Sequence, residues 1–221
     1  CEIHYGTMVD PHYLCIGSIL RLASEKSIVW GAGFIKEDEE AFGEPIIKAV
    51  RGPLSRQKLL DQGFSCPEIY GDPALLLPRY YNPSIKKQYK IGIIPHYIDQ
   101  DNEWLVQFKD NPNVNVINIL NPLVLNFVDE VKKCDVILSS SLHGIICGDA
   151  YGIPSYWIEL SDKVIGKGFK FLDYFLSVKR RDKKPIKIKE NTKLEEIKFK
   201  DYKIDIDLDL LYNACPFRRN K

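Results

Sequence analysis

Short apolar segments alternate with helical segments along almost the whole chain, and this alternation limits the fold more than any other feature. The segments Ser27–Trp30, Ile46–Arg51, Lys90–Pro95 and Asp135–Ser139 have the composition of buried strands, and each leads into a turn or a helical pattern. A buried strand followed by a helix is typical of βαβ units, in which the strands form a parallel sheet. The sequence therefore predicts an α/β fold.

A break in this alternation near residue 85 divides the chain in two. Residues 81–87 contain Asn-Pro-Ser and a lysine pair, which interrupt regular structure, and the alternation then begins again. We therefore expect residues 1–85 and 86–221 to form two Rossmann-like domains, the second closed by a C-terminal helix. A substrate would lie in the cleft between them, at the carboxyl ends of the strands. Cys1 begins within the pattern, so we expect the first domain to lack an N-terminal piece.

The composition favours a soluble cytoplasmic protein. Hydrophobic residues make up 45% and charged residues 28% of the chain, and the net charge of +1 gives no electrostatic reason to bind nucleic acid. The longest uncharged run, residues 136–148, contains three serines and a histidine, so no membrane span is predicted. Six cysteines without a CxxC pair fit reduced thiols. The protein could still reach the inner face of a membrane through a partner or a lipid-linked substrate.

The strongest candidate site follows the strand that ends at Ser139. Ser139, Ser140 and Ser141 stand between this strand and a helix that we expect to begin at Leu142. The first turn of a helix carries free backbone N–H groups and a partial positive charge, so it binds phosphate or carboxylate. His143 falls in this turn and could donate a hydrogen bond or transfer a proton. A capped helix with a structural histidine explains the same pattern equally well.

Weaker candidates lie at other strand ends. Arg51 ends a strand shortly before a helix that opens at Pro53 and is closed by Gly63. Its guanidinium suits a bidentate contact with a carboxylate or phosphate. His96 follows another buried strand, where a lone histidine is usually a packing residue. Gly31 and Gly33 would let a ligand approach the backbone, but the third glycine of a dinucleotide fingerprint is absent.

Three lysines, Lys163, Lys167 and Lys170, follow the strand expected at residues 154–159, where each could neutralise a phosphate or be ordinary surface. A metal site is not expected, because the four histidines show no HxxxH or HxH spacing and there is no DxD motif. The chain also lacks GxxxxGK[ST] and GxSxG, which excludes P-loop NTPases and α/β-hydrolases.

The run Ser139-Ser-Ser-Leu-His-Gly144, which continues to Pro154, resembles the signature of the polysaccharide pyruvyltransferase family. Other segments are similar to landmarks of this family in the same order, from about residue 13 to the end. They are Val29-Trp-Gly-Ala-Gly33, Val50-Arg-Gly-Pro-Leu-Ser55, Gly71-Asp-Pro-Ala-Leu75, Ile94-Pro-His96 and Gly168-Phe-Lys-Phe-Leu-Asp-Tyr174.

The resemblance implies a GT-B-like fold with an acceptor-side N-terminal domain and a donor-binding C-terminal domain. It also implies transfer of the enolpyruvyl unit of phosphoenolpyruvate onto two hydroxyls of a sugar, forming a pyruvate ketal on a bacterial exopolysaccharide, a capsule or a lipid-linked oligosaccharide precursor. Neither a cofactor nor a metal is implied. Catalysis falls to His143 and Arg51. The implied substrate-binding residues are Ser139, Ser140, Ser141, Leu142, Gly144, His96, Lys170, Gly31 and Gly33.

The chain departs from the family pattern at two points. Many members carry an arginine that binds the donor two residues before the histidine, where this chain has Ser141. Donor anchoring would then fall to Arg51, to the serines or to a lysine. The Gly-Asp loop near the start of the family pattern is also not recognisable here.

Two other functions fit the same residues. A GT-B-like glycosyltransferase would place the diphosphate of a sugar nucleotide on the same helix N-terminus. A non-catalytic family member that binds an anionic glycan would be consistent with Ser141. Binding of phosphoenolpyruvate, of a nucleotide sugar or of the glycan alone distinguishes the three.

Overall fold

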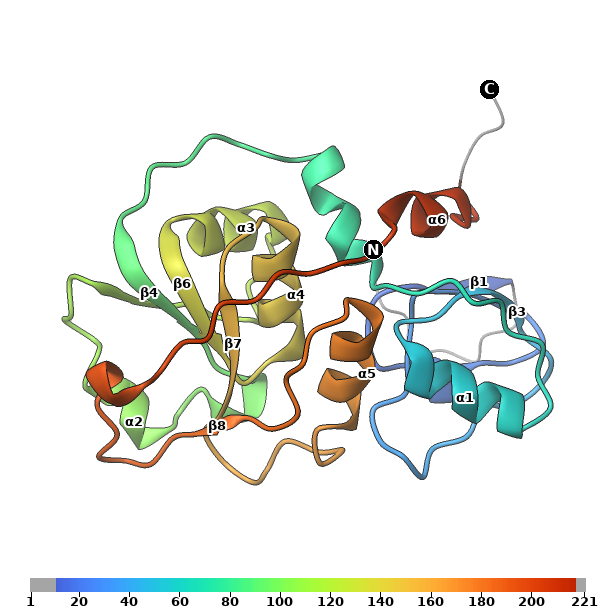
Figure 1. Ribbon diagram of the computed structural model, residues 1–221, viewed down its shortest axis with the longest axis horizontal. Coiled ribbons are helices and arrows are strands. Elements are labelled where there is room, and N and C mark those ends of the chain that lie inside the picture. The colour runs from blue at the N-terminus through green and yellow to red at the C-terminus, as the bar shows by residue number, and fades with distance from the viewer. Residues whose placement is uncertain (1–10, 218–221) are drawn as a thin grey trace. The chain divides into compact units, whose positions relative to one another are not determined.

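A computed structural model describes residues 11–217, and its contacts divide the chain into two compact units. Unit 1 takes residues 1–73, 168–181 and 205–221, and unit 2 takes residues 74–167 and 182–204. Each unit contains a parallel sheet with helices (Figure 1). The α/β fold with parallel strands that the alternation predicted is therefore confirmed.

Unit 1 is built on a three-stranded parallel sheet in the order β1-β2-β3. Its strands are β1 (His12–Leu14), β2 (Ser27–Trp30) and β3 (Ile46–Ala49), and its helices are α1 (Pro53–Asp61), α5 (Phe169–Ser177), α6 (Leu208–Asn213) and the 3-10 helix η1 (Leu20–Leu22). The core of this unit joins residues from the sheet, from η1 and from α1, among them Leu20, Val29, Phe34 and Leu59.

The ends of α1 follow directly from the sequence. Pro53 occupies the first helical position, where the missing N–H would have had no partner in the helix anyway. The chain leaves the helix through Gly63, whose φ of +86° lies in the left-handed region that glycine adopts without strain. The sequence predicted both boundaries of this helix.

The chain returns to unit 1 through α5, which packs on α1 (Figure 1). Gly52, the residue before α1, lies so close to α5 that a Cβ there would be 1.9 Å from the backbone oxygen of Asp173. Residues 168–181 therefore belong with the N-terminal part of the chain. The sequence analysis had instead divided the chain into the continuous segments 1–85 and 86–221.

Unit 2 contains a five-stranded parallel sheet in the order β5-β4-β6-β7-β8. The strands are β4 (Tyr89–Ile94), β5 (Val114–Val116), β6 (Cys134–Ser139), β7 (Ser155–Glu159) and β8 (Ile186–Lys187), and the helices are α2 (Glu103–Val106), α3 (Val124–Lys132) and α4 (Leu142–Ala150). Three 3-10 helices complete the description: η2 (Pro73–Arg79), which crosses the boundary between the units, η3 (Tyr97–Asp99) and η4 (Leu194–Glu196).

Both faces of the unit 2 sheet are covered, as expected for parallel strands. Neighbouring residues of one strand enter different clusters: Ile94 and Ile137 pack with α3 and α4, whereas Ile93 and Leu138 pack with α2. This division follows from the alternation of side chains along a strand. It also explains why these strands are apolar at successive positions.

The strand order of unit 2 creates a natural binding position. Counted along the chain, the strands lie in the order 2-1-3-4-5, so the connections leave β4 toward opposite sides of the sheet. In open α/β sheets, ligands bind at this switch point, outside the carboxyl ends of the strands. Here the switch point lies between β4 and β6, the strands that precede His96 and the serine run.

Several local expectations differ from the structure. The short apolar segment at residues 68–70 also predicts a strand, but it forms only an isolated bridge, Val50 to Tyr70. The strands β1 and β8 were not anticipated. Cys134 and Cys147 are buried core residues, as their position in apolar runs of the sequence indicates. The expectation that the first domain lacks an N-terminal piece stays a prediction, since residues 1–10 lie outside the described part of the chain.

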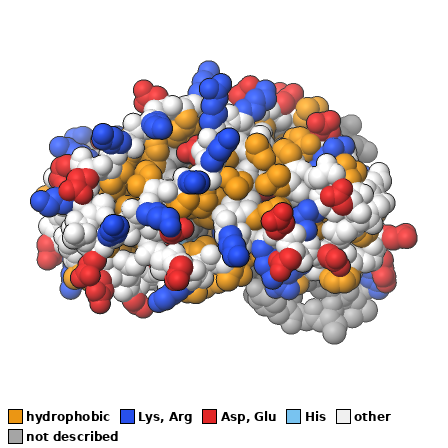
Figure 2. Space-filling view, turned by 60° about the horizontal axis from the view of Figure 1, so that its bottom comes forward, with side chains coloured by type: hydrophobic (Ala, Val, Ile, Leu, Met, Phe, Trp, Pro, Cys, Tyr) orange, Lys and Arg blue, Asp and Glu red, His pale blue; other side chains and the backbone are white. Residues whose placement is uncertain are grey.

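The surface carries charges of both signs. Figure 2 shows Lys and Arg side chains lying among Asp and Glu side chains over the face drawn, in line with the net charge of +1. Within residues 11–217, no helix has the length and hydropathy needed to cross a membrane.

The contact between Gly52 and α5 leads to a first prediction. Gly52→Ala should lower the free energy of unfolding by about 3 kcal/mol, because its Cβ would collide with backbone and not with a mobile side chain. The backbone at Gly52 is extended, with φ −163°, so the loss would come from the collision alone. Urea unfolding followed by circular dichroism measures it.

Gly63→Ala provides the matched control. A Cβ at Gly63 meets no atom within 4 Å, so this change should cost only the strain of a positive φ, about 1 kcal/mol. An equal loss of stability in the two variants would contradict the close packing of α1 on α5.

Candidate active site

The serine run forms a tight turn between β6 and α4, as the sequence predicted. β6 ends at Ser139, α4 begins at Leu142, and Ser141 occupies the N-cap position. A Cβ at Gly144 would lie 2.4 Å from Ser139 Oγ and 3.0 Å from Ile94 Cγ2. The glycine therefore lets the first turn of α4 lie directly against the ends of β4 and β6.

The hydroxyl of Ser139 makes its hydrogen bonds to backbone groups of this turn and of the end of β4. Its Oγ lies 2.9 Å from the Ile94 carbonyl and 2.8 Å from the Ser141 carbonyl, and it accepts a hydrogen bond from Ser141 N at 3.0 Å. A hydroxyl has one hydrogen to donate, so the two carbonyls share it. This hydroxyl shapes the turn.

Ser140 joins the ends of three strands through a buried carboxylate. Its Oγ accepts a hydrogen bond from His96 N at 2.8 Å and donates one to Asp99 Oδ2 at 3.2 Å. Ser161 Oγ donates to the other oxygen of Asp99. Because His96, Ser140 and Ser161 follow β4, β6 and β7, the 3%-exposed carboxylate of Asp99 holds these three ends together.

Ser141 differs from its two neighbours. It is buried and stands at the N-cap of α4, yet its side chain makes no capping hydrogen bond. A serine in this position usually accepts a hydrogen bond from the first-turn N–H groups. Here the Ser141 side chain accepts no hydrogen bond from these N–H groups. The positive end of a nine-residue helix therefore faces the switch point between β4 and β6.

Two histidines accompany the turn. His143 lies in the first turn of α4, half-buried, with a buried Nε2 atom. His96 is almost fully buried, its Nδ1 accepts a long hydrogen bond from Ile98 N at 3.4 Å, and its ring lies 4.3 Å from the ring of Tyr97. His96 thus caps η3, whereas His143 belongs to the helix turn that can receive an anion.

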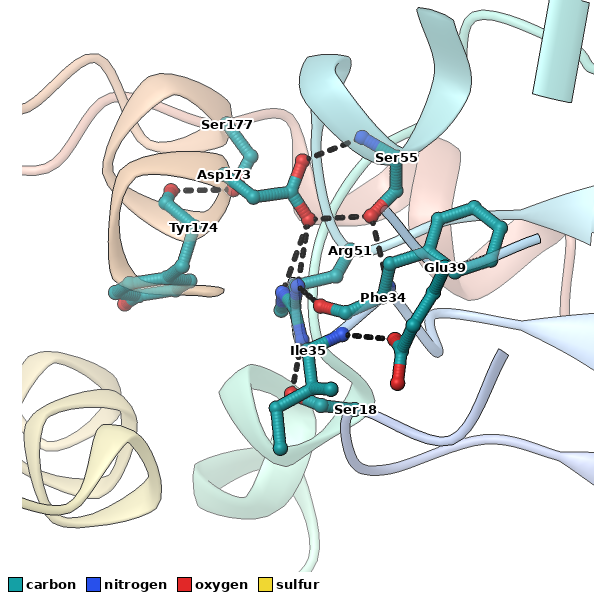
Figure 3. A network of polar contacts seen from close by, with 9 residues as sticks. All are labelled: Ser18, Phe34, Ile35, Glu39, Arg51, Ser55, Asp173, Tyr174 and Ser177. Carbon is teal, nitrogen blue, oxygen red and sulfur yellow. Dashed lines mark hydrogen bonds and ion pairs between the residues drawn. The ribbon is translucent and has the colours of Figure 1, made fainter. Parts of the chain in front are cut away.

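Arg51 forms a second polar centre, in unit 1. Its guanidinium is fully buried and donates from Nε to Asp173 Oδ2 at 3.0 Å, from Nη1 to Ser18 Oγ at 2.7 Å and from Nη2 to the Phe34 carbonyl at 2.6 Å (Figure 3). Nη2 also lies 2.9 Å from Asp173 Oδ2 as an ion pair. These contacts join the segment between β3 and α1 to α5.

The partner carboxylate is equally well satisfied. Asp173 accepts hydrogen bonds from Ser55 N at 2.9 Å and from Ser55 Oγ at 2.7 Å, in addition to those from Arg51 (Figure 3). Buried ion pairs need such extra hydrogen bonds, because the loss of hydration is expensive. The pair is therefore a fixed structural element of unit 1.

The two predicted glycines serve packing inside unit 1. A Cβ at Gly33 would lie 2.5 Å from Arg51 Cζ, so only glycine leaves room for the buried guanidinium. A Cβ at Gly31 would lie 2.3 Å from Pro73 Cδ. Contact of either glycine with a ligand stays a prediction.

Lys170 also belongs to unit 1, because it lies on α5 one turn before Asp173. It is 6% exposed, and burial together with the nearby Arg51 charge lowers its pKa to about 8. Lys163 and Lys167 are exposed residues of unit 2. The predicted site residues thus fall into two groups: Gly31, Gly33, Arg51 and Lys170 in unit 1, and His96 with Ser139–Gly144 in unit 2. From their positions at strand ends, Arg51 and the Ser139–His143 turn were also expected to hold one small anion together, and this stays a prediction.

Among the described residues, no three His, Cys, Asp or Glu side chains gather as a metal site would require. The expectation that the reaction uses neither a metal nor a cofactor stays a prediction.

Comparison with known proteins identifies the family. Residues 6–162 match polysaccharide pyruvyl transferase, a stretch that includes Arg51 and the whole turn at Ser139–Gly144. The chain belongs to the polysaccharide pyruvyl transferase family. A relative from Acanthamoeba polyphaga mimivirus, named "Uncharacterized protein L143", is 30% identical over 216 residues, which cover 92% of this chain and 74% of the relative. The resemblance inferred from the sequence is thereby confirmed.

In this pyruvyl transferase family member, the sequence analysis missed two buried carboxylates, Asp99 and Asp173. Asp173 gave a usable signal, because it lies with Lys170, Tyr174 and Ser177 on one side of a helix that is otherwise strongly apolar. A charged residue on a buried helix face usually has a buried partner. Asp99 gave no such signal, since its partners lie 41 and 62 residues away.

The unequal roles of the serines lead to a second prediction. Ser140→Ala should lower the free energy of unfolding by about 1–3 kcal/mol. It removes the hydroxyl that accepts a hydrogen bond from His96 N–H and donates one to Asp99 Oδ2, and both of these groups are buried. Ser141→Ala should change it by less than about 0.5 kcal/mol, since no capping hydrogen bond is lost. Urea unfolding of both variants measures the difference, and equal costs would contradict the assignment.

Proposed function

We propose that this family member transfers the enolpyruvyl group of phosphoenolpyruvate onto a sugar, forming a pyruvate ketal. The acceptor would be a cell-surface polysaccharide or its lipid-linked precursor, and the reaction would take place in the cytoplasm or at the inner face of the membrane. One observation carries the proposal: the first turn of α4, uncapped by Ser141, opens at the switch point of the unit 2 sheet within the family-matched residues.

The proposed chemistry needs charge stabilisation and one group that moves protons. Protonation of the methylene carbon of phosphoenolpyruvate creates an oxocarbenium-like centre, and a sugar hydroxyl adds to it and releases its proton. A second hydroxyl then displaces phosphate and closes the ketal ring. Backbone N–H groups at the start of α4 would hold the anionic donor, and His143 in the same turn would give and take the proton.

The remaining residues of the proposed site have supporting roles. Leu142 and Gly144 shape the turn, and Ser139 and Ser140 hold it against the strand ends. Arg51 is proposed as a ligand of the donor carboxylate or phosphate in a GT-B-like arrangement of the two units. Its hydrogen bonds to Asp173 would then fix the orientation of the guanidinium in advance.

Ser141 supports one other function. Without a guanidinium at this position, the same turn could bind an anionic glycan and perform no chemistry. The decisive experiment is incubation of the purified protein with phosphoenolpyruvate and candidate sugar acceptors, followed by mass spectrometry. Pyruvyl transfer predicts a product heavier by one pyruvate less one water, together with release of inorganic phosphate.

Transfer from a nucleotide sugar in place of phosphoenolpyruvate would instead support a glycosyltransferase. Binding of an acidic glycan with no product from either donor would support the non-catalytic function. Either result would overturn the proposed reaction.

A further prediction concerns the proton carrier. His143→Ala should reduce turnover by about a hundredfold to ten-thousandfold, the usual contribution of general acid–base catalysis, and leave the melting temperature close to that of the parent. His96→Ala should reduce turnover less, because His96 caps η3 and lies outside the turn of α4. The measurements are steady-state rates of pyruvyl transfer and thermal unfolding. A His143→Ala variant that turns over within a few-fold of the parent would show that His143 is structural.

A further inference from the structure

The positive charge of the chain is concentrated in one segment of unit 2, residues 182–204, which we call the lysine strap. The strap contains eight lysines and five Asp or Glu residues, an excess of three positive charges. The rest of the chain, taken together, has two more acidic than basic residues. All eight lysines of the strap are exposed, so this excess lies at the surface.

Apolar side chains and backbone contacts hold the lysine strap on unit 2. Its strand β8 pairs with β7, Trp104 Nε1 donates a hydrogen bond to the Thr192 carbonyl at 2.8 Å, and Ile197 is buried in the core cluster on the α2 face of the sheet. Figure 1 shows the strap in orange and red, passing from β8 to the short helix near α2 and then back across β7. Because α4 packs on the other face of the sheet, the strap is built from different residues than the turn before α4.

An aromatic ring is exposed among the lysines near the end of the strap. The Phe199 ring stacks on the ring of Tyr156, with the ring centres 4.7 Å apart and an angle of 29° between the planes, yet Phe199 stays 40% exposed. Tyr156 is itself buried, donates its hydroxyl to the Lys200 carbonyl at 3.2 Å and meets the Tyr202 ring edge-on. The Phe199 ring therefore rests on a fixed support.

The lysines beside Phe199 have no acidic partner within the described residues 11–217. There, the ammonium groups of Lys198, Lys200 and Lys203 make neither a hydrogen bond nor a salt bridge. With Asp201 between them, residues 198–203 carry an excess of two positive charges. Like charges gathered at a surface repel one another, and an anionic partner relieves this repulsion.

We propose that residues 198–203 of the lysine strap bind an acidic polysaccharide. The C–H face of one sugar ring packs on the exposed Phe199 ring, and the neighbouring ammonium groups pair with carboxylates of the glycan. The identity of this glycan as one that carries pyruvate ketals rests on the proposed function. Each ketal adds one carboxylate, so the modified polymer should bind more tightly than its precursor.

The surroundings of Phe199 favour a glycan over a lipid surface. Membrane-binding segments combine their cations with a broad apolar face that enters the lipid. Within residues 182–204, all of which the structure describes, Phe199 is the only large apolar side chain that is exposed. One aromatic ring with cations beside it matches one sugar ring with its acidic substituents.

Binding of the full chain to immobilised polysaccharides tests the proposal. The probes are alginate, dextran and an exopolysaccharide that carries pyruvate ketals, the last one before and after mild acid has removed the ketals. The parent protein should bind alginate and the intact exopolysaccharide, and should bind neutral dextran and the acid-treated polymer more weakly. Added salt should weaken binding of the acidic polymers, because it screens the exposed charges.

Two variants examine the two parts of the surface. The double variant Lys198→Gln/Lys200→Gln should weaken alginate binding by about threefold to tenfold, as expected for two exposed ion pairs. Phe199→Leu keeps an apolar side chain on Tyr156 but removes the ring, and should weaken binding by a similar factor. Thermal unfolding of each variant verifies the fold, and the double variant decides the question if Phe199→Leu fails to fold.

Lys86→Gln/Lys90→Gln is the matched control, because both residues are exposed lysines of unit 2 outside the strap and the change in net charge is the same. It should bind alginate like the parent. An equal loss in the two double variants, or unchanged binding in both strap variants, would overturn the surface. Binding to phosphatidylglycerol vesicles that depends on Phe199 and is tighter than binding to alginate would assign the strap to a membrane and also overturn it.

Pyruvyl transfer, measured on the same variants, separates this inference from the proposed reaction. Transfer at the parental rate together with unchanged polysaccharide binding in the strap variants would refute the surface and leave the reaction standing. Binding of acidic polysaccharide that depends on Lys198 and Lys200, but without transfer from phosphoenolpyruvate to any acceptor, would support the surface and count against the reaction.

Discussion

The buried ion pair between Arg51 and Asp173 joins two segments that lie 122 residues apart, and much of unit 1 depends on it. Both side chains have lost all contact with water, so the pair is tolerable only because Ser18, Ser55 and the Phe34 carbonyl satisfy the remaining hydrogen bonds. The same contact explains why α5 belongs to unit 1. Glycines stand where the chain passes closest to this pair, Gly33 beside the guanidinium and Gly52 beside Asp173.

Buried hydrogen bonds also fix the turn in unit 2. The Ser139 hydroxyl bonds to backbone carbonyls and the Ser140 hydroxyl bonds to Asp99, which also accepts a hydrogen bond from Ser161. These bonds hold the ends of β4, β6 and β7 together. The backbone at the start of α4 receives no capping hydrogen bond from Ser141. Backbone amides bind carboxylate and phosphate without adding a full positive charge.

Much of the fold was predictable, because short-range rules decide it. Apolar strands before helical patterns predicted the parallel sheets, and Pro53 and Gly63 predicted the ends of α1. The short strands β1 and β8, of three and two residues, carry too little periodicity to be recognised. The place of α5 in unit 1 was not predictable, because its contacts with α1 and with Arg51 join segments that lie far apart in the sequence.

The sequence alone determined which residue types stand at the ends of the strands, and with them the family and the turn before α4, because strand, serine run and helix are contiguous. Only the tertiary structure decided what each side chain does there. Ser139, Ser140 and Ser141 look alike in the sequence, yet two are bound to distant partners and one is not. Lys170 likewise looked like one of three similar lysines. Its burial beside Arg51 sets it apart, because burial and a neighbouring charge are properties of the folded chain and not of the residue.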